Sequence, residues 1–138
     1  MKKENYTEFV EQLQAHAREK IEDKDLNPDL EVDCAVEPSD FTRENAQKVE
    51  NFGPFGIGNS EPIFLLADVH IQDCKSVGAK AEHLQFYAQK GPLRLKGIAF
   101  RFGDKITELQ KSKDILFKLK TSNWTREGVE IELVDARA

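Results

Sequence analysis

The C-terminal half of the chain contains five short segments with the apolar spacing of β-strands. In most of them apolar and polar residues alternate, and a period of two places successive side chains on opposite faces of a strand. The segment at 105–111 differs, because Ile106 and Leu109 are three positions apart, as on one side of a helix. This pattern restricts the chain to a few small β-rich folds. The expected strands are 64–71, 83–89, 93–102, 115–120 and 129–134.

Three strands, a helix and two strands within about 75 residues are the element order of the OB-fold. This fold is a five-stranded Greek-key barrel that commonly binds oligonucleotides. Other small barrels and sandwiches have similar orders, so the order favours the OB-fold without excluding them. We therefore predict a mainly β protein, with the barrel at 63–138 and an additional N-terminal strand and helices.

The third expected strand changes its apolar face near Gly97. Its two leucines occupy odd positions, whereas the isoleucine and phenylalanines that follow occupy even positions. A β-bulge at Gly97 would return both sets to the barrel interior. It would also place Arg101 on the outer face together with Arg94 and Lys96.

The N-terminal part contains three further elements. Residues 5–21 carry apolar side chains at intervals of three and four, which predicts a helix whose narrow apolar stripe docks on another part of the protein. Residues 30–36 alternate as a half-buried strand does. A second helix is expected from a capping Thr42 to Glu50.

The net charge of −5 is distributed unevenly along the chain. Residues 1–62 hold 15 acidic and 7 basic side chains, a net charge of −8, whereas residues 63–138 hold 10 acidic and 13 basic ones, a net charge of +3. Lys and Arg supply most of the nonspecific affinity of proteins for DNA. The basic half is therefore the candidate binding half.

The composition also limits the location of the protein and its metal sites. No apolar run approaches the roughly 20 residues that span a bilayer, and the N-terminus lacks the apolar core of a signal peptide, so we expect a cytoplasmic protein without a membrane partner. Cys34 and Cys74 are 40 positions apart and have no Cys or His cluster near them. This excludes a zinc knuckle, and we expect two ordinary core thiols.

A glycine- and proline-rich segment at 53–62 separates the two halves and is too rich in turn residues to form a helix or strand. It reads Pro54-Phe55-Gly56-Ile57-Gly58-Asn59, followed by Glu61-Pro62. This order resembles the Pro-Phe-Gly-x-Gly-Asn-Pro-x-Pro signature that opens the OB region of RecJ-type single-strand-specific exonucleases, with Ser60 in place of a proline. Further matches follow in the family's order at His83-Leu84, Ile98-Ala99-Phe100, Asn123-Trp124 and Val134-Asp135-Ala136-Arg137.

The glycines of this segment have two possible roles. Their backbone amides can contact a phosphate, but the segment lacks the Lys-Ser/Thr ending of a phosphate-binding loop. We therefore interpret the segment as a structural loop, which consists of Pro54, Phe55, Gly56, Gly58 and Asn59.

The resemblance covers about residues 6–138 and implies an OB-fold module from the C-terminal region of a DHH-family nuclease of DNA repair and recombination. It implies a tail of a preceding DHHA1-like domain at 1–27 and the OB-fold domain at 28–138. The family's metal-binding motifs lie upstream of the matched region, and none of His16, His70 and His83 has the aspartate or glycine neighbours that those motifs require. We expect no cofactor and no nuclease activity in this chain, with Mg²⁺ or Mn²⁺ bound only by a separate catalytic core.

The outer face of the predicted barrel carries the candidate ligand residues. OB-folds hold single strands by stacking bases on aromatic rings and contacting phosphates with basic side chains. Simpler roles are solvated lysines and rings that cover the end of the barrel. The candidates are Tyr87, Arg94, Lys96, Arg101, Lys118, Lys120 and Trp124.

Two functions follow from the resemblance. The first is a single-stranded-DNA-binding module that guides the strand of a 5'-3' exonuclease toward the catalytic core. The alternative is a docking module that packs against the parent nuclease or a repair partner such as a single-strand-binding protein. A contiguous basic and aromatic groove favours the first function, whereas an exposed apolar patch of more than a few hundred Å² favours the second.

Overall fold

The computed structural model describes residues 5–21 and 29–138, and the chain divides into two units after Glu31. The first unit contains helix α1 (Tyr6–Lys20), which confirms the helix predicted from the apolar spacing. Its largest apolar side chains, Tyr6, Phe9 and Leu13, are exposed within that unit. The predicted domain boundary between residues 27 and 28 lies outside the described residues.

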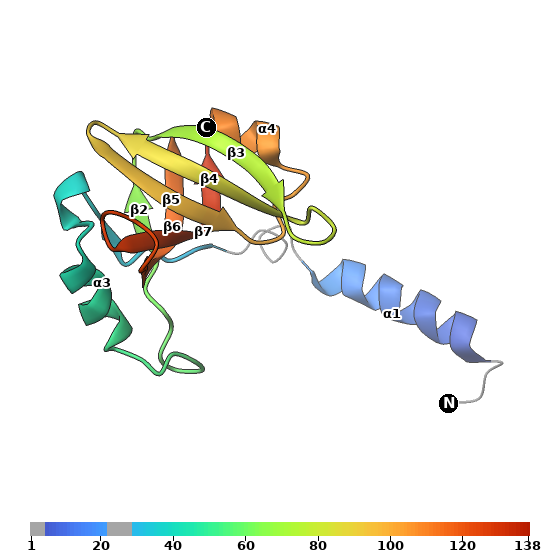
Figure 1. The fold of residues 1–138 in the computed structure, drawn as a ribbon. Helices are drawn as coiled ribbons and strands as arrows, with labels where there is room; N and C mark the ends of the chain where they lie inside the picture. The colour runs from blue at the N-terminus through green and yellow to red at the C-terminus, as the bar shows by residue number, and fades with distance from the viewer. Residues whose placement is uncertain (1–4, 22–28) are drawn as a thin grey trace. The chain divides into compact units, whose positions relative to one another are not determined.

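The second unit is built around a closed β-barrel (Figure 1). The hydrogen-bonded strand order is β1-β2-β6-β7-β5-β4-β3. β2 and β3 are consecutive parts of one strand, and they pair with β6 and β4 respectively, so the sheet closes on itself. β5 and β7 are parallel, as in the five-stranded OB-fold that the sequence predicts. The elements are β2 (Phe64–Leu66), β3 (His70–Val77), β4 (His83–Lys90), β5 (Leu93–Ala99), α4 (Ile106–Lys111), β6 (Asp114–Thr121) and β7 (Val129–Arg137).

The predicted strand at 64–71 bends between β2 and β3. Leu66 and Val69 are three positions apart and both are buried, which a straight strand with a period of two does not permit. Asp68 lies at the bend with a φ of 55°, in the left-handed region that Asp tolerates better than most residues. The bend therefore allows one strand to contribute to two sides of the barrel.

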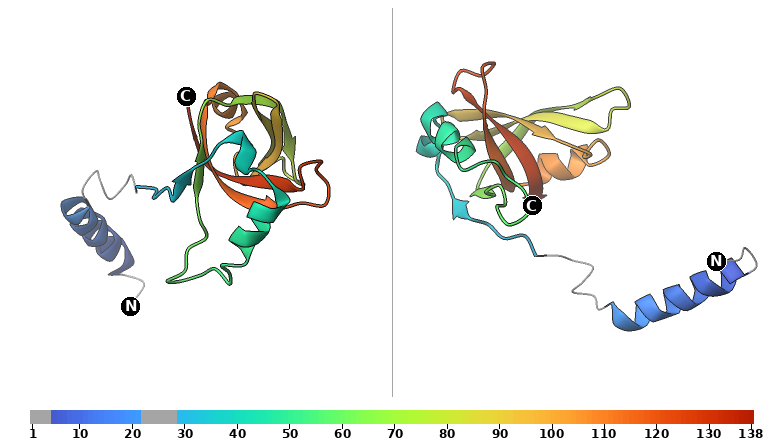
Figure 2. Two further views of the ribbon diagram at one scale, coloured as in Figure 1. Left: turned by 90° about the vertical axis from the view of Figure 1, so that its left-hand side faces the viewer. Right: turned by 90° about the horizontal axis from the view of Figure 1, so that it is seen from below.

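Apolar side chains fill the barrel, and a helix lies at each of two ends (Figures 1 and 2). α4 places the fully buried Leu109 at one end. At the other end, α3 (Arg43–Glu50) follows Phe41, whose ring stacks on Phe117 with a centroid distance of 5.5 Å. The side-chain oxygen of Thr42 accepts a hydrogen bond from the backbone N–H of the third helical residue, which confirms the predicted cap.

The predicted bulge at Gly97 is wrong. β4 and β5 pair without a register shift along their whole length, and the odd-numbered positions of β5 face the interior. Phe86 lies directly opposite Gly97, and a Cβ atom on Gly97 would lie only 2.4 Å from Cζ of that ring. Glycine is therefore needed because the aromatic ring occupies the space of a side chain. Phe100, in contrast, is 48% exposed beyond the end of β5.

The strand predicted at 30–36 is shorter and more exposed than expected. Within the described residues of this segment only β1 (Cys34–Ala35) is a strand, and it pairs in parallel with β2. It lies at the edge of the sheet, outside the closed barrel, so its neighbour Val32 remains 41% exposed. Cys34 of β1 is exposed rather than buried as predicted, whereas Cys74 is half-buried and packs against the core.

Candidate nucleic-acid interface

Three of the predicted ligand residues lie together on the outer face of β4 and β5. The register places Tyr87 opposite Lys96 and Gln89 opposite Arg94, and directly opposed residues in an antiparallel pair point to the same face. These strands correspond to the second and third strands of an OB-fold, which form its ligand surface. We call this surface the β4–β5 face.

Arg94 lies across the ring of Tyr87. Its Cζ atom is 3.7 Å from the ring centroid, within the range of a cation–π interaction. Its Nη2 atom donates a hydrogen bond of 2.6 Å to Oδ2 of Asp73 on β3. No ion pair with Lys96 occurs in the described parts of the chain. The β4–β5 face therefore combines a guanidinium stacked on an aromatic ring with a second cationic side chain, that of Lys96.

Arg101 lies outside the β4–β5 face. β5 ends at Ala99, and Arg101 occupies the following turn with a φ of 63°. Its backbone N–H donates a hydrogen bond of 3.1 Å to Nδ1 of His83, which fixes the turn to the start of β4. The predicted placement of Arg101 beside the other cations depended on the bulge, and it is wrong because the register continues unchanged through β5.

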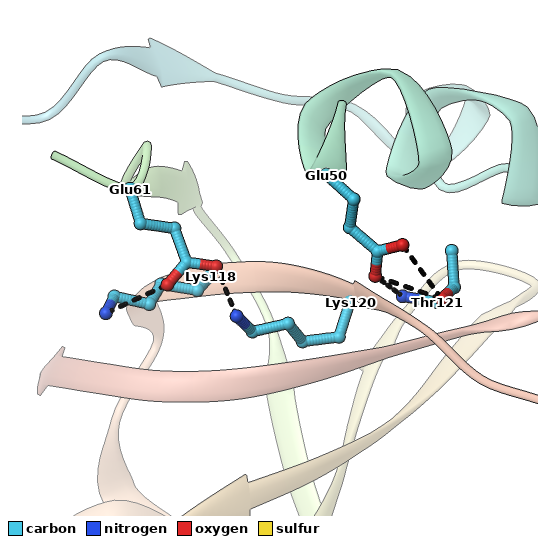
Figure 3. A network of polar contacts seen from close by, with 5 residues as sticks. All are labelled: Glu50, Glu61, Lys118, Lys120 and Thr121. Carbon is cyan, nitrogen blue, oxygen red and sulfur yellow. Dashed lines mark hydrogen bonds and ion pairs between the residues drawn. The ribbon is translucent and has the colours of Figure 1, made fainter. Parts of the chain in front are cut away.

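Lys118 and Lys120 lie on the outer face of β6 and share one carboxylate (Figure 3). Nζ of Lys118 is 3.1 Å from Oε2 of Glu61, and Nζ of Lys120 pairs with the other oxygen. The register also places Glu132 and Glu130 of β7 opposite the two lysines. Their positive charge is therefore balanced by nearby carboxylates, and little of it is available to a phosphate.

Replacing Glu61 with glutamine is expected to destabilise the protein by roughly 1 to 2 kcal/mol at pH 7. This value lies between the cost of breaking an exposed salt bridge and the cost of breaking a buried one. Burial disfavours the charged carboxylate, but hydrogen bonds from Lys120 and Lys118 outweigh it and hold the pKa of Glu61 below its ordinary value of 4.5. Because the pKa is lowered on folding, this stabilisation is present above about pH 4.5 and is lost as the pH falls through the folded-state pKa.

Urea unfolding between about pH 7 and pH 2 measures the difference in unfolding free energy between wild type and Glu61→Gln. The difference should narrow in acid, where the wild-type carboxyl is protonated. Glu44→Gln is the matched control, because Glu44 pairs with Lys48 on the exposed surface of α3 and should contribute much less. A difference that stays constant down to pH 2 would contradict the electrostatic role of Glu61.

The loop at 122–128 joins β6 and β7 and extends from the barrel (Figure 2). It contains Trp124, which is 89% exposed. The loop is held by internal hydrogen bonds: the N–H of Ser122 donates to the carbonyl of Gly128 at 2.9 Å, and the N–H of Trp124 donates to the side-chain Oγ of Ser122 at 3.2 Å. The fold therefore exposes a large aromatic ring on a loop that is held by hydrogen bonds.

Helix α3 holds this loop and the adjacent end of β6 through two side chains that the sequence analysis missed. Arg43 donates to the carbonyl of Ser122 at 3.3 Å and to Oδ1 of Asn123 at 3.0 Å. The Glu50 carboxylate accepts hydrogen bonds from the backbone N–H and the hydroxyl of Thr121, at 2.8 and 2.9 Å (Figure 3). These partners are more than 70 positions apart, so no local pattern in the sequence marks them.

The glycine-rich segment forms a tight turn between α3 and β2. Gly56 and Asn59 exchange two backbone hydrogen bonds of 2.9 and 3.1 Å, and Gly58 has a φ of 81°. The side-chain amide of Asn59 also donates hydrogen bonds to the backbone carbonyls of Phe52 and Pro54, both at 3.0 Å. The backbone amides of Gly56 and Asn59 are thus already used within the turn, which supports the structural interpretation of this loop.

A cavity of about 350 Å³ lies between α3, β1 and the adjacent end of the barrel. It is mainly apolar and is lined on one side by three aromatic rings. None of the predicted ligand residues lines this cavity, so it is separate from the β4–β5 face. The aromatic residues are Phe41, Phe64 and Phe117, and the polar residues are Asp40, Asn45 and Lys48.

No group of three or more His, Cys, Asp or Glu side chains is arranged to hold a metal ion in residues 5–21 and 29–138. No helix in the same ranges is long and apolar enough to cross a membrane.

Comparison with known proteins connects this barrel to one family. The sequence model of the RecJ OB domain matches residues 32–135. The single-stranded-DNA-specific exonuclease RecJ of Bacillus subtilis (strain 168) is 24% identical over 104 residues, which cover 75% of this chain and 13% of that protein. The matched family is the OB domain and not the DHH catalytic domain, in agreement with the lack of catalytic motifs in the sequence.

A similar fold also occurs in the solved structure of a protein from a different functional class. The crystal structure of a Leishmania major Friedlin protein, described as an aspartyl-tRNA synthetase, superposes with a TM-score of 0.52 at 8% identity. It covers 93% of this chain and 26% of the other, and at this identity it supports the fold alone. The match of the family model over most of the chain, together with the barrel topology, shows that this chain belongs to the RecJ OB domain family.

Proposed function

We propose that this chain is a single-stranded-DNA-binding module, which guides a strand toward the catalytic core of a RecJ-type exonuclease in DNA repair and recombination. One observation carries the proposal: aromatic and cationic side chains occupy both surfaces with which OB-folds bind oligonucleotides. Tyr87, Arg94 and Lys96 lie on the β4–β5 face, and Trp124 and Arg126 lie on the exposed loop between β6 and β7. Rings that stack on bases and cations that contact phosphates are the parts that such binding needs.

The number of phosphate contacts is expected to be small. Lys118 and Lys120 are balanced by the largely buried carboxylate of Glu61, whereas the pair of Arg94 with Asp73 is exposed and open to exchange. The main candidates are therefore Arg94, Lys96 and Arg126. Each phosphate contact to a single strand contributes about −0.7 to the slope of log K against log salt, so about three contacts give a slope near −2. Binding by the isolated chain should therefore be weak and sensitive to salt.

A titration of the chain with a labelled oligothymidine at several salt concentrations tests this expectation, with fluorescence anisotropy as the readout. A duplex of the same length is the control and should bind less tightly, because paired bases cannot stack on the rings. Equal affinity for single strands and duplex would contradict stacking as the basis of binding. No detectable binding at low salt would contradict the proposal for the isolated chain.

A second candidate function, docking to the parent nuclease or to a repair protein, rests on the exposed apolar side chains of α1. Tyr6, Phe9 and Leu13 are 59%, 49% and 54% exposed, and they lie at the intervals of three and four that form one helix face. Such a stripe is typical of a helix that packs on a partner. If the titration shows no single-strand binding, docking becomes the better account of the chain.

A further inference from the structure

One ion pair crosses the centre of the β4–β5 face. Arg94 of β5 reaches over Tyr87 of β4 to Asp73 of β3, with an Nη2–Oδ2 distance of 2.6 Å. The guanidinium carbon is 3.7 Å from the centroid of the Tyr87 ring, so the group covers one side of that ring. In this arrangement the guanidinium of Arg94 contacts both the Tyr87 ring and the Asp73 carboxylate.

The backbone of β3 places Asp73 at this position. The register between β3 and β4 shifts between Gln72 and Lys75, where β3 has one residue more than its partner. Asp73 lies within the bulge and has a φ of 51°, in the left-handed region. A bulge redirects the side chain that it carries. The position of the carboxylate beside Arg94 therefore follows from the irregularity of the strand.

A phosphate can take the place of this carboxylate. Both groups present oxygens that match the fork of donors on a guanidinium. The side chains of Arg94 and Asp73 are 45% and 61% exposed, so a strand that lies on the face can reach the pair from solvent. An exposed ion pair contributes at most about 1 kcal/mol to stability. If a strand must break the pair in order to bind, this cost corresponds to about a fivefold change in affinity.

We infer that Asp73 competes with the phosphates of a bound strand for Arg94, and that the exchange uncovers Tyr87 for stacking. This inference rests on the proposed function and adds an internal competitor to the site. While the pair is intact, Arg94 lies over the ring and its charge is neutralised. When a phosphate replaces the carboxylate, Arg94 moves toward the backbone of the strand and the ring becomes available to a base.

The first experiment measures oligothymidine affinity at low salt in a double-mutant cycle. Asp73→Asn should tighten binding by about fivefold, because the competing charge is removed and Arg94 is released. In an Arg94→Gln background the same substitution should change the dissociation constant by less than about twofold. Glu108→Gln is the control for lost negative charge, since Glu108 is exposed on α4, which lies against β3 and β7 away from this face.

The second experiment needs no DNA. The chain contains two tyrosines, and tetranitromethane nitration of each can be followed by mass spectrometry of the peptides. Tyr6, which is 59% exposed on α1, serves as an internal reference. Nitration of Tyr87 relative to Tyr6 should be at least about twofold faster in Asp73→Asn than in wild type, with unchanged thermal unfolding as the check on the fold.

The outcomes separate the inference from the proposed function. Unchanged nitration of Tyr87, or tightening by Asp73→Asn that persists in the Arg94→Gln background, overturns the role of Asp73 even if wild type binds DNA. Loss of all single-strand binding in wild type and variants, with faster nitration in Asp73→Asn, overturns the proposed function while leaving the Asp73–Arg94 contact confirmed. Faster nitration together with the coupled gain in affinity supports both.

Discussion

The Gly97→Ala variant is expected to lose about 3 kcal/mol of unfolding free energy, at the upper end of the usual cost of overpacking a core. A Cβ atom on Gly97 would lie 2.4, 2.7 and 2.8 Å from three carbon atoms of the Phe86 ring, closer than van der Waals contact allows. Phe86 is fully buried, so its ring cannot move into solvent to relieve the contact. Equilibrium unfolding in urea measures the loss.

Two companion variants separate the steric contact from general effects of alanine. Gly56→Ala places a methyl group where no heavy atom lies within 4 Å and the φ is not positive, so stability should change by less than about 0.5 kcal/mol. Combining Gly97→Ala with Phe86→Leu should cost less than the sum of the two single changes, because a smaller side chain leaves room for the methyl group. A near-neutral Gly97→Ala would instead indicate that the strand can form the bulge suggested by its apolar pattern.

The Trp124→Ala variant is expected to weaken single-strand binding by about 5- to 150-fold, which corresponds to the 1 to 3 kcal/mol of one base stacked on an aromatic ring. Trp124 is 89% exposed, and its loop accepts two hydrogen bonds from Arg43 of α3, while Glu50 of α3 holds the adjacent end of β6. Little backbone freedom is therefore lost when a base stacks on the ring. Because Trp124 is the only tryptophan of the chain, quenching of its fluorescence reports the contact in wild type.

Single lysine variants provide the comparison for Trp124. Lys96→Ala should weaken binding by less than Trp124→Ala, since it removes one phosphate contact. Lys120→Ala should have a still smaller effect on binding, because Lys120 is already paired with Glu61. Trp124→Phe keeps an aromatic surface and should retain most of the affinity. Wild-type affinity in Trp124→Ala would show that the exposed ring is not part of the interface.

The sequence alone determined the order of the elements and the family. Alternating apolar residues define the strands because each strand buries one of its two faces, and this property is local. The cap at Thr42 is local in the same sense, since its hydroxyl bonds a backbone amide only three residues away. The glycine-rich signature and the short motifs that follow it were sufficient to indicate the RecJ OB domain, which the family match confirms.

The tertiary structure decided which of the candidate residues share a surface and which are paired with carboxylates. The Glu61 carboxylate that balances Lys118 and Lys120 comes from 57 or more positions away, and Arg43 comes from 79 positions away. The parity change at Gly97 suggested a bulge, but the Phe86 ring from the neighbouring strand fills the space above the glycine instead. Charge pairing and packing across strands depend on which segments meet in three dimensions, and the periodicity of a single segment does not contain that information.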